Sequence, residues 1–203
     1  MENKLDSFLD TVKNEISENI ENINKEDLKK AVEIILISEK NGGRLHVTGI
    51  GKPGHVAGYV ASLFSSTGTP AYELHGTEAV HGSSGQVRPG DVVIAISNSG
   101  ETTELKATVE TLHRNGAHII SCTGNKNSWL SKNSEVCLLA HVDKEGDILN
   151  KAPRASILSE ILVLQSLSVL LQDAKNLDLN QYVKWHPGGS LGESIRKIQE
   201  GDK

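Results

Sequence analysis

Residues 91–105, DVVIAISNSGETTEL, decide how this chain folds. The stretch opens with a short apolar run rich in Val and Ile, which predicts a strand. It continues through small and polar residues around Gly100 and then enters a helical pattern that reaches about residue 115. A strand that passes through a polar loop straight into a helix is the repeating unit of α/β proteins, so this stretch favours that fold class.

The same alternation continues on both sides of this stretch. Helical patterns near residues 54–66 and 127–133 separate further short apolar runs. Because strands that alternate with helices imply right-handed crossovers, we expect a parallel sheet. The sequence therefore predicts a three-layer α/β/α sandwich with a five-stranded parallel sheet of the flavodoxin or Rossmann type. The predicted strands are residues 45–50, 70–74, 91–97, 117–123 and 135–142.

Helical patterns also precede and follow the predicted sheet. Apolar residues at three- and four-residue steps over residues 5–23 predict a long amphipathic helix, and a second helix is expected over about residues 26–40. A last helix, residues 156–172, is apolar around most of its circumference. We therefore expect a helical arm over residues 1–43 and the main domain over residues 44–203.

Length and composition exclude several classes of protein. The chain has 203 residues, of which 37% are hydrophobic and 23% charged, as expected of one globular domain. A net charge of −5 and an aromatic content of 3% disfavour nucleic acid as a partner.

The chain carries no sign of export or of a membrane. Its opening residues have no signal-peptide pattern, and the apolar segment 161–171 is short for a bilayer, so we expect no membrane partner and a cytoplasmic protein. Cys122 and Cys137 lie in apolar runs and are interpreted as core residues.

The loop after the first predicted strand is one candidate site, because ligands of open parallel sheets bind at the carboxyl ends of the strands. Residues 49–54, GIGKPG, match the G-x-G-x-x-G pattern, and Glu73 stands near the position of a ribose-binding acid. These features favour a NAD(P)-binding oxidoreductase. Lys52 opposes that alternative, because a cation in this loop suits a ligand with its own anionic oxygen or a developing enediolate.

The loop after the third predicted strand is the stronger signal. Ser97, Ser99, Thr102 and Thr103 place hydroxyl groups around Gly100 at the start of a helix, whose free N–H groups and dipole favour an anion. The plainer interpretation is a helix N-cap, but a cap uses one hydroxyl. Together with the cation of the neighbouring loop, this loop predicts a site for a small phosphorylated metabolite.

Five motifs follow one another along the chain: GIGKPGH (49–55), SSTGTPAYELHGTEAVHG (65–82), DVVIAISNSGETTEL (91–105), Thr123-Gly124-Asn125 and WHPGGSLG (185–192). In this order they resemble the SIS (sugar isomerase) domain family, and within it the arabinose-5-phosphate isomerase-like group. The resemblance implies a domain that interconverts aldose and ketose sugar phosphates through a cis-enediol(ate), without a cofactor. It also implies a homodimer or a homotetramer.

The same resemblance implies which residues form the site. The family's active-site lysine, two glutamates and histidine match Lys52, Glu104, Glu145 and His186. We expect a glutamate, Glu145 ahead of Glu104, to move the carbon proton, His186 to open the sugar ring and Lys52 to stabilise the enediolate. His186 is expected to enter the site of a neighbouring copy. The expected phosphate- and sugar-binding residues are Gly51, Ser66, Thr67, His81, Ser97, Asn98, Ser99, Gly100 and Thr102.

Some positions depart from the family pattern and leave the identity of the sugar open. Pro53 stands where a serine is usual, Ser83 replaces an aspartate, and residues 154–157 replace a stretch rich in serine and threonine. The regulatory CBS modules of longer members are not expected, since the chain ends at Lys203.

Two further expectations concern metals and catalysis. No metal is expected, because His75 and His81 flank Glu78 at no established ligand spacing. A sugar-phosphate-binding or sensing protein without catalysis is the other alternative. Such a protein would keep the serine loop and would not need the paired glutamates.

Overall fold

A five-stranded sheet forms the centre of the computed structural model, which describes residues 2–186, 188, 189 and 193. All neighbouring strands pair in parallel, in the order β2-β1-β3-β4-β5. The predicted α/β class and the number of strands are confirmed, and the order is that of the flavodoxin type. The strands are β1 (Leu45–Gly49), β2 (Ala71–His75), β3 (Val92–Ile96), β4 (His118–Thr123) and β5 (Val136–Leu139).

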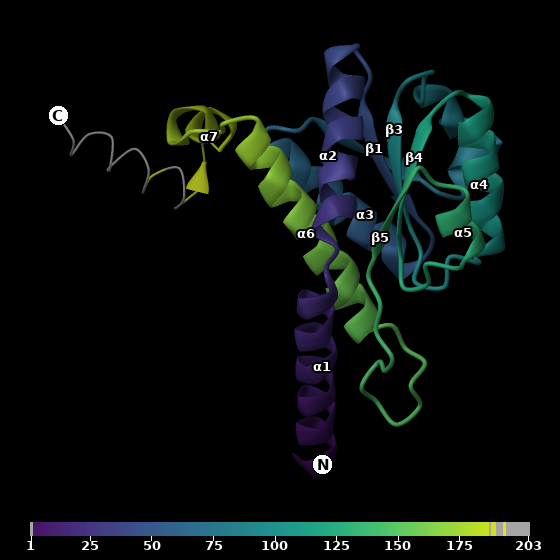
Figure 1. Cartoon of the computed structure of the whole chain (residues 1–203), viewed down its shortest axis with the longest axis vertical. Helices are drawn as coiled ribbons and strands as arrows, with labels where there is room; N and C mark the ends of the chain where they lie inside the picture. Colours follow the sequence, from purple (N-terminus) through teal and green to yellow (C-terminus); the bar gives the residue numbers. More distant parts are fainter. Residues whose placement is uncertain (1, 187, 190–192, 194–203) are drawn as a thin grey trace.

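Helices cover both faces of the sheet and complete the three layers (Figure 1). One face packs against α2 (Lys25–Lys40), α3 (Lys52–Ser66) and α6 (Ala155–Ala174). The other face packs against α4 (Thr103–Arg114) and α5 (Trp129–Lys132). The hydrophobic core is divided accordingly, because successive side chains of a strand point to opposite faces. Ile94 lies in the cluster under α2, α3 and α6, whereas its neighbours Val93 and Ala95 lie in the cluster under α4.

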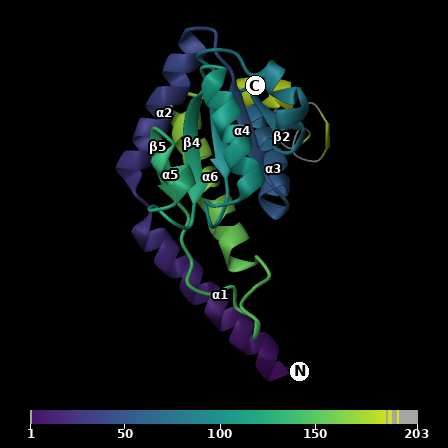
Figure 2. The ribbon, with the colours of Figure 1, turned by 90° about the vertical axis from the view of Figure 1, so that its right-hand side faces the viewer.

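The predicted helical arm over residues 1–43 contains two helices: α1 (Glu2–Asn22) projects away from the sheet (Figure 2), whereas α2 packs into the core beside the sheet. Helix α1 buries one described residue, Asn19, and leaves Leu5 and Leu9 more than half exposed. The loop over residues 143–154 runs beside it. Three short helices were not expected from the sequence: η1 (Glu78–His81), η2 (Ser83–Gln86) and α7 (Leu179–Trp185).

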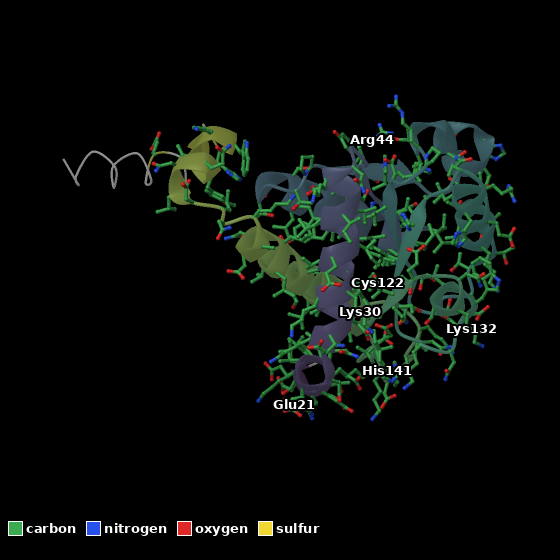
Figure 3. All side chains as sticks on the ribbon, turned by 45° about the horizontal axis from the view of Figure 1, so that its top comes forward. Glu21, Lys30, Arg44, Cys122, Lys132 and His141 are labelled. Atoms are coloured by element: carbon green, nitrogen blue, oxygen red, sulfur yellow. The ribbon has the colours of Figure 1, made fainter. Side chains whose placement is uncertain are left out.

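A buried aspartate ties together the amino-terminal edge of the sheet. Asp91 accepts hydrogen bonds from the backbone N–H groups of Arg44 at 2.8 Å and Arg88 at 2.9 Å, and from the Arg44 guanidinium at 3.0 Å. His46 Nε2 lies 3.2 Å from the same carboxylate. Although burial acts to raise it, these hydrogen bonds hold the pKa of Asp91 below its ordinary value. In Figure 3, Arg44 marks this edge and His141 marks the carboxyl edge.

Helix α6 is longer than the sequence analysis expected. Its 20 residues, with a mean hydropathy of 1.6, make it long and apolar enough to cross a membrane by length and composition. Half of that span is buried inside the fold, where it packs against α1, α2, α3 and β4. A core helix has the same pattern.

Candidate functional site

The site predicted from the sequence lies where the strand order reverses. β1 stands between β2 and β3, and Gly49 at its end is the register partner of Ile96 at the end of β3. Neighbouring strands are about 5 Å apart, so the loops that follow these two residues start side by side. The crevice beyond such a reversal is where ligands of this fold type bind.

The serine loop, residues 97–102, forms a compact turn at the end of β3. Ser97 Oγ accepts a hydrogen bond from Gly100 N at 3.1 Å and lies 3.2 Å from Thr102 Oγ1. Ser99 Oγ accepts from Glu101 N at 3.2 Å and is exposed. These hydroxyls therefore fix the shape of the loop, and those of Ser99 and Thr102 remain within reach of solvent.

Gly100 is required for that shape. Its φ of +66° is rare for residues with a side chain, and an added Cβ would lie 2.2 Å from Ser128 Oγ. Its carbonyl accepts a hydrogen bond from Leu130 N at 3.1 Å, which braces the loop against α5. Asn98 is held in a similar way, because its carbonyl accepts from Gly124 N at 2.9 Å.

The helices that begin at the crevice lack side-chain caps. Helix α4 begins after Thr102 and helix α3 begins after Gly51, and neither start has a side-chain cap. In contrast, α2, α5 and α7 are capped by Asn24, Ser128 and Asp178. The first N–H groups of a helix have no partner within the helix, so those of α4 are available to an anion. At α3 fewer are available, because Pro53 has no N–H group and Gly54 N donates to the carbonyl of Gly51 at 3.0 Å.

Two of the predicted catalytic side chains stand at these open helix starts. Lys52 is the first residue of α3, Glu104 is the second residue of α4, and both are exposed. Within the described part of the chain, neither side chain forms a hydrogen bond or an ion pair. The first turn of α3 passes close to the end of β1. Gly49 is required there, because an added Cβ would lie 2.7 Å from the backbone of Pro53. The structure thus places a free cation and a free carboxylate beside the serine loop.

A small cavity of about 150 Å³ opens at the ends of β1 and β2. Gly49, Gly51 and Gly54 line it together with Glu73 and His75. The residues that the NAD(P)-binding alternative would use therefore line one cavity. The cavity is smaller than the roughly 300–1,000 Å³ of typical ligand pockets, which disfavours a dinucleotide there.

Glu145 lies in a different setting from Glu104. It is 9% exposed, and its Oε2 accepts hydrogen bonds from Arg154 N at 2.6 Å and Ser156 N at 3.1 Å. The carboxylate therefore caps the start of α6, which has no cap from its own Arg154 side chain. Because α4 and α6 cover opposite faces of the sheet, the two glutamates approach the carboxyl edge from opposite sides.

Several predicted site residues lie at the other edge of the sheet. Ser66 ends α3 and Thr67 follows it, and both donate hydroxyl hydrogen bonds to the carbonyl of Leu63. The structure therefore places these two residues away from Lys52 within one chain, and their contact with the ligand stays a prediction. The reason is that α3 runs antiparallel to the strands, so its 15 residues carry the chain about 22 Å away from Lys52.

His186 also lies away from the crevice. It stacks on Tyr182 with ring centroids 4.0 Å apart, and the neighbouring Trp185 packs against Gly68. Figure 1 shows α7 at the end of α6 that lies away from α1. The 20 residues of α6 separate the two ends by about 30 Å, so His186 does not reach Glu145 of its own chain. Residues 187 and 190–192 of the WHPGGSLG motif lie outside the described residues.

His81 is exposed at the end of η1, which packs against α4. Among the residues that the structure describes, no group of three or more His, Cys, Asp or Glu side chains is arranged to hold a metal ion.

One residue of note was missed in the sequence. Glu160 on α6 is fully buried, and neither of its carboxyl oxygens has a hydrogen-bond partner in the part of the chain that the structure describes. The signal was present, because Glu160 is the single charged residue between Ser156 and Gln172. An acid within such an apolar helix is expected to be buried.

Comparisons with known proteins show which family this chain is similar to. The family model of the SIS domain matches residues 36–170. The arabinose 5-phosphate isomerase KdsD of Francisella tularensis is 40% identical over 187 residues, which is 92% of this chain and 55% of that protein. The KdsD of Escherichia coli K12 is 39% identical over 153 residues, which is 75% of this chain and 47% of that protein. This chain therefore spans about half the length of the curated relatives it matches.

Two solved structures share the fold over nearly the whole chain. The E. coli CFT073 protein c3406, solved in complex with arabinose 5-phosphate, superposes with a TM-score of 0.80 at 33% identity and covers 90% of this chain and 95% of its own. A candidate sugar-phosphate isomerase of Listeria monocytogenes superposes with a TM-score of 0.84 at 30% identity and covers 92% and 96%.

Proposed function

The chain belongs to the SIS domain family, and from that premise we propose that it is a phosphosugar isomerase of the arabinose-5-phosphate isomerase type. The observation that carries the proposal is the pair of uncapped helix starts at the crevice, beside a serine loop whose hydroxyls reach solvent. A monophosphate accepts from the N–H groups at the start of α4, and the Lys52 ammonium at the start of α3 has the opposite charge. The c3406 structure, which holds arabinose 5-phosphate, supports this class of ligand.

In the proposed complex the phosphate lies at the start of α4. Ser97, Asn98 and Gly100 hold the loop in shape, while Ser99, Thr102 and the first N–H groups of α4 donate to the phosphate oxygens. Gly51, at the start of α3, leaves room for the sugar, because nothing lies within 4 Å of the position where its Cβ would be.

Isomerisation moves a proton between adjacent carbons of the open-chain sugar. A carboxylate takes the proton from the carbon next to the carbonyl group and returns it to the former carbonyl carbon, and the cis-enediol(ate) carries negative charge in between. We assign the proton transfer to Glu145 or Glu104 and the stabilisation of the enediolate to Lys52. The exposed and unpaired Lys52 and Glu104 support this assignment, because neither is committed to a structural contact.

Ring opening by His186 requires a second copy of the chain. Within one chain about 30 Å of helix separates His186 from Glu145, so His186 of a neighbouring copy is the one that acts. A homodimer or homotetramer is therefore part of the proposal. The partly exposed stripe of α1 and a cleft of about 760 Å³ between α1 and residues 144–154 support it, since both offer unfilled apolar surface beside Glu145.

The test is isomer exchange followed by NMR. Purified protein is mixed with arabinose 5-phosphate in D₂O, and the ketose signals and deuterium at the exchanged carbon are recorded. We expect both to appear, and to fall about 100-fold or more with the Lys52→Ala variant. Pentose and hexose phosphates are compared in parallel, because Pro53, Ser83 and Arg154 depart from the family pattern. Exchange with none of them would contradict the proposal.

A protein that binds sugar phosphates without catalysis is the second candidate. The observation that favours it is the capping of α6 by Glu145, which gives that carboxylate a structural task. Saturable binding of a sugar phosphate without isomer exchange would establish this candidate. In either case we expect a cytoplasmic protein whose ligand is a small phosphorylated sugar.

A further inference from the structure

Glu160 is an acid enclosed by the apolar core. The residue is 0% exposed, and its two carboxyl oxygens have no hydrogen-bond partner among the described residues. The hydroxyl groups of Ser156 and Ser159, on the same helix, are also buried without a partner. An unpaired carboxylate charge in a protein interior is strongly disfavoured, so the residue is expected to be neutral. In agreement, burial raises the pKa of Glu160 to about 8, with the Glu145 carboxylate adding to the effect.

The elements around Glu160 offer it no cation among the described residues. The buried residues of α2 and α3 carry no ionisable side chain, and α1 buries Asn19 alone. On the sheet, β4 presents the buried thiol of Cys122, and Cys137 on β5 is half-buried. The ionisable neighbours of Glu160 are thus Glu145 and the Cys122 thiol, and burial raises the pKa of Cys122 so that it too is neutral.

Glu145 and Glu160 share the start of α6. Glu145 accepts from the backbone N–H of Ser156, and Glu160 follows Ser156 by four residues, one turn further along the same face. The N–H groups and the dipole at the start of α6 therefore stabilise one carboxylate charge, that of Glu145. A negative charge on Glu160, one turn further along α6, would repel the Glu145 carboxylate, because the apolar core screens charges poorly.

We propose that Glu160 is a positioning residue for Glu145: its neutral form leaves Glu145 as the one carboxylate charge at the start of α6, and its ionisation switches the site off. Repulsion from ionised Glu160 would move the Glu145 carboxylate away from the backbone N–H groups of Arg154 and Ser156. The carboxylate base would then no longer be held in place. The inference rests on the proposed function, and within it on proton transfer by Glu145 rather than by Glu104.

The first experiment compares pH profiles of kcat in the wild type and the Glu160→Gln variant, which keeps the shape of the side chain and cannot ionise. We expect the wild type to lose about tenfold of its kcat between pH 7 and pH 9, reversibly and with an unchanged far-UV circular dichroism spectrum. Glu160→Gln should lose less than twofold. The matched control is Glu110→Gln, at an exposed acid on α4, which should follow the wild type. The same alkaline loss in wild type and Glu160→Gln would overturn the proposal.

The second experiment does not depend on activity. The wild-type protein is labelled with ¹³C at the glutamate carboxyl carbons, and its NMR spectrum is followed from pH 5 to pH 10. We expect one resonance to titrate near pH 8, to be absent in Glu160→Gln, and to be accompanied by a second inflection of the Glu145 resonance at the same pH. A titration near pH 8 that leaves the Glu145 resonance unmoved overturns the proposal, as does a protein in which no glutamate titrates above pH 7.

These two readouts separate the inference from the proposed function. If the wild type exchanges no sugar phosphate, the proposed function fails, while the NMR titration still decides whether Glu160 controls Glu145. If Glu160→Gln does not fold, the wild-type titration of the Glu145 resonance decides alone.

Discussion

The starts of α4 and α6 pose the same physical problem and solve it differently. Each helix begins at the carboxyl edge with N–H groups that lack a partner in the helix, and neither is capped by its own N-cap side chain. At α6 the protein supplies the missing acceptor, because Glu145 reaches back from the preceding loop. At α4 the start is open, and Glu104 beside it has no partner among residues 2–186. The comparison shows that a candidate anion site lies where the N–H groups at a helix start find no acceptor within the protein.

The largest expected effect comes from removing both glutamates. The double variant Glu104→Gln, Glu145→Gln should reduce isomer exchange about 10³-fold, because a carboxylate that transfers the proton contributes on the order of 10²–10⁴ to the rate. Sugar-phosphate binding should remain, since the serine loop is intact. Isomer exchange by NMR and a thermal-shift titration measure the two properties. Full activity in the double variant would remove both residues from the mechanism.

The next effect concerns the open helix start itself. Gly100→Ala should weaken sugar-phosphate binding by about 100-fold, because the added Cβ meets Ser128 Oγ at 2.2 Å and φ is +66°. The ligand-induced increase in melting temperature measures the change. Gly85→Ala on η2 is the control, since nothing lies within 4 Å of its Cβ position. Equal binding by the two variants would mean that the loop does not hold the ligand.

Stability separates the two glutamates most directly. Glu145→Ala should lower the free energy of unfolding by about 2 kcal/mol, because two backbone N–H groups at the start of α6 lose a buried acceptor. Glu104→Ala should change it by less than about 0.5 kcal/mol, as for other exposed residues without a partner. Urea denaturation measures both. A larger loss in Glu104→Ala than in Glu145→Ala would reverse the contrast between α4 and α6.

The smallest expected effect is a pH dependence of stability at α6. The pKa of Glu160 is about 8 in the folded protein, against an ordinary value of 4.5. Above pH 4.5 the unfolded chain therefore releases a proton that the folded protein retains, so stability falls as the pH rises, until about pH 8. Between pH 6 and pH 7 the wild type should lose roughly 1 kcal/mol relative to Glu160→Gln. Urea denaturation of both proteins at both pH values measures the change. The same difference in free energy of unfolding between wild type and Glu160→Gln at pH 6 and pH 7 would contradict the prediction.

Most of the fold followed from sequence patterns with a simple physical cause. The apolar runs and the helical periodicity between them predicted the parallel sheet, and the observed strands end within three residues of the expected positions. The short helices η1, η2 and α7 were missed, because four to seven residues are too few to show a period.

The site was predictable in part. The open starts of α3 and α4 follow from strand–loop–helix order, which is local in the sequence. The position of Ser66 and Thr67 could also have been deduced, since they end the helix that begins at Lys52 and must return to the other edge. The capping of α6 by Glu145 could not, because it depends on how residues 143–154 fold back on a helix start.

The Asp91 cluster has a consequence for engineering. The acceptor and its partners Arg44, His46 and Arg88 fasten the edge of the sheet that faces away from the crevice. The loops proposed to bind the sugar start at the carboxyl ends of the strands. They take no part in the hydrogen bonds of Asp91 given above. New substrate preferences can therefore be introduced into those loops by library selection, while the fastened edge keeps the strands of every variant in register.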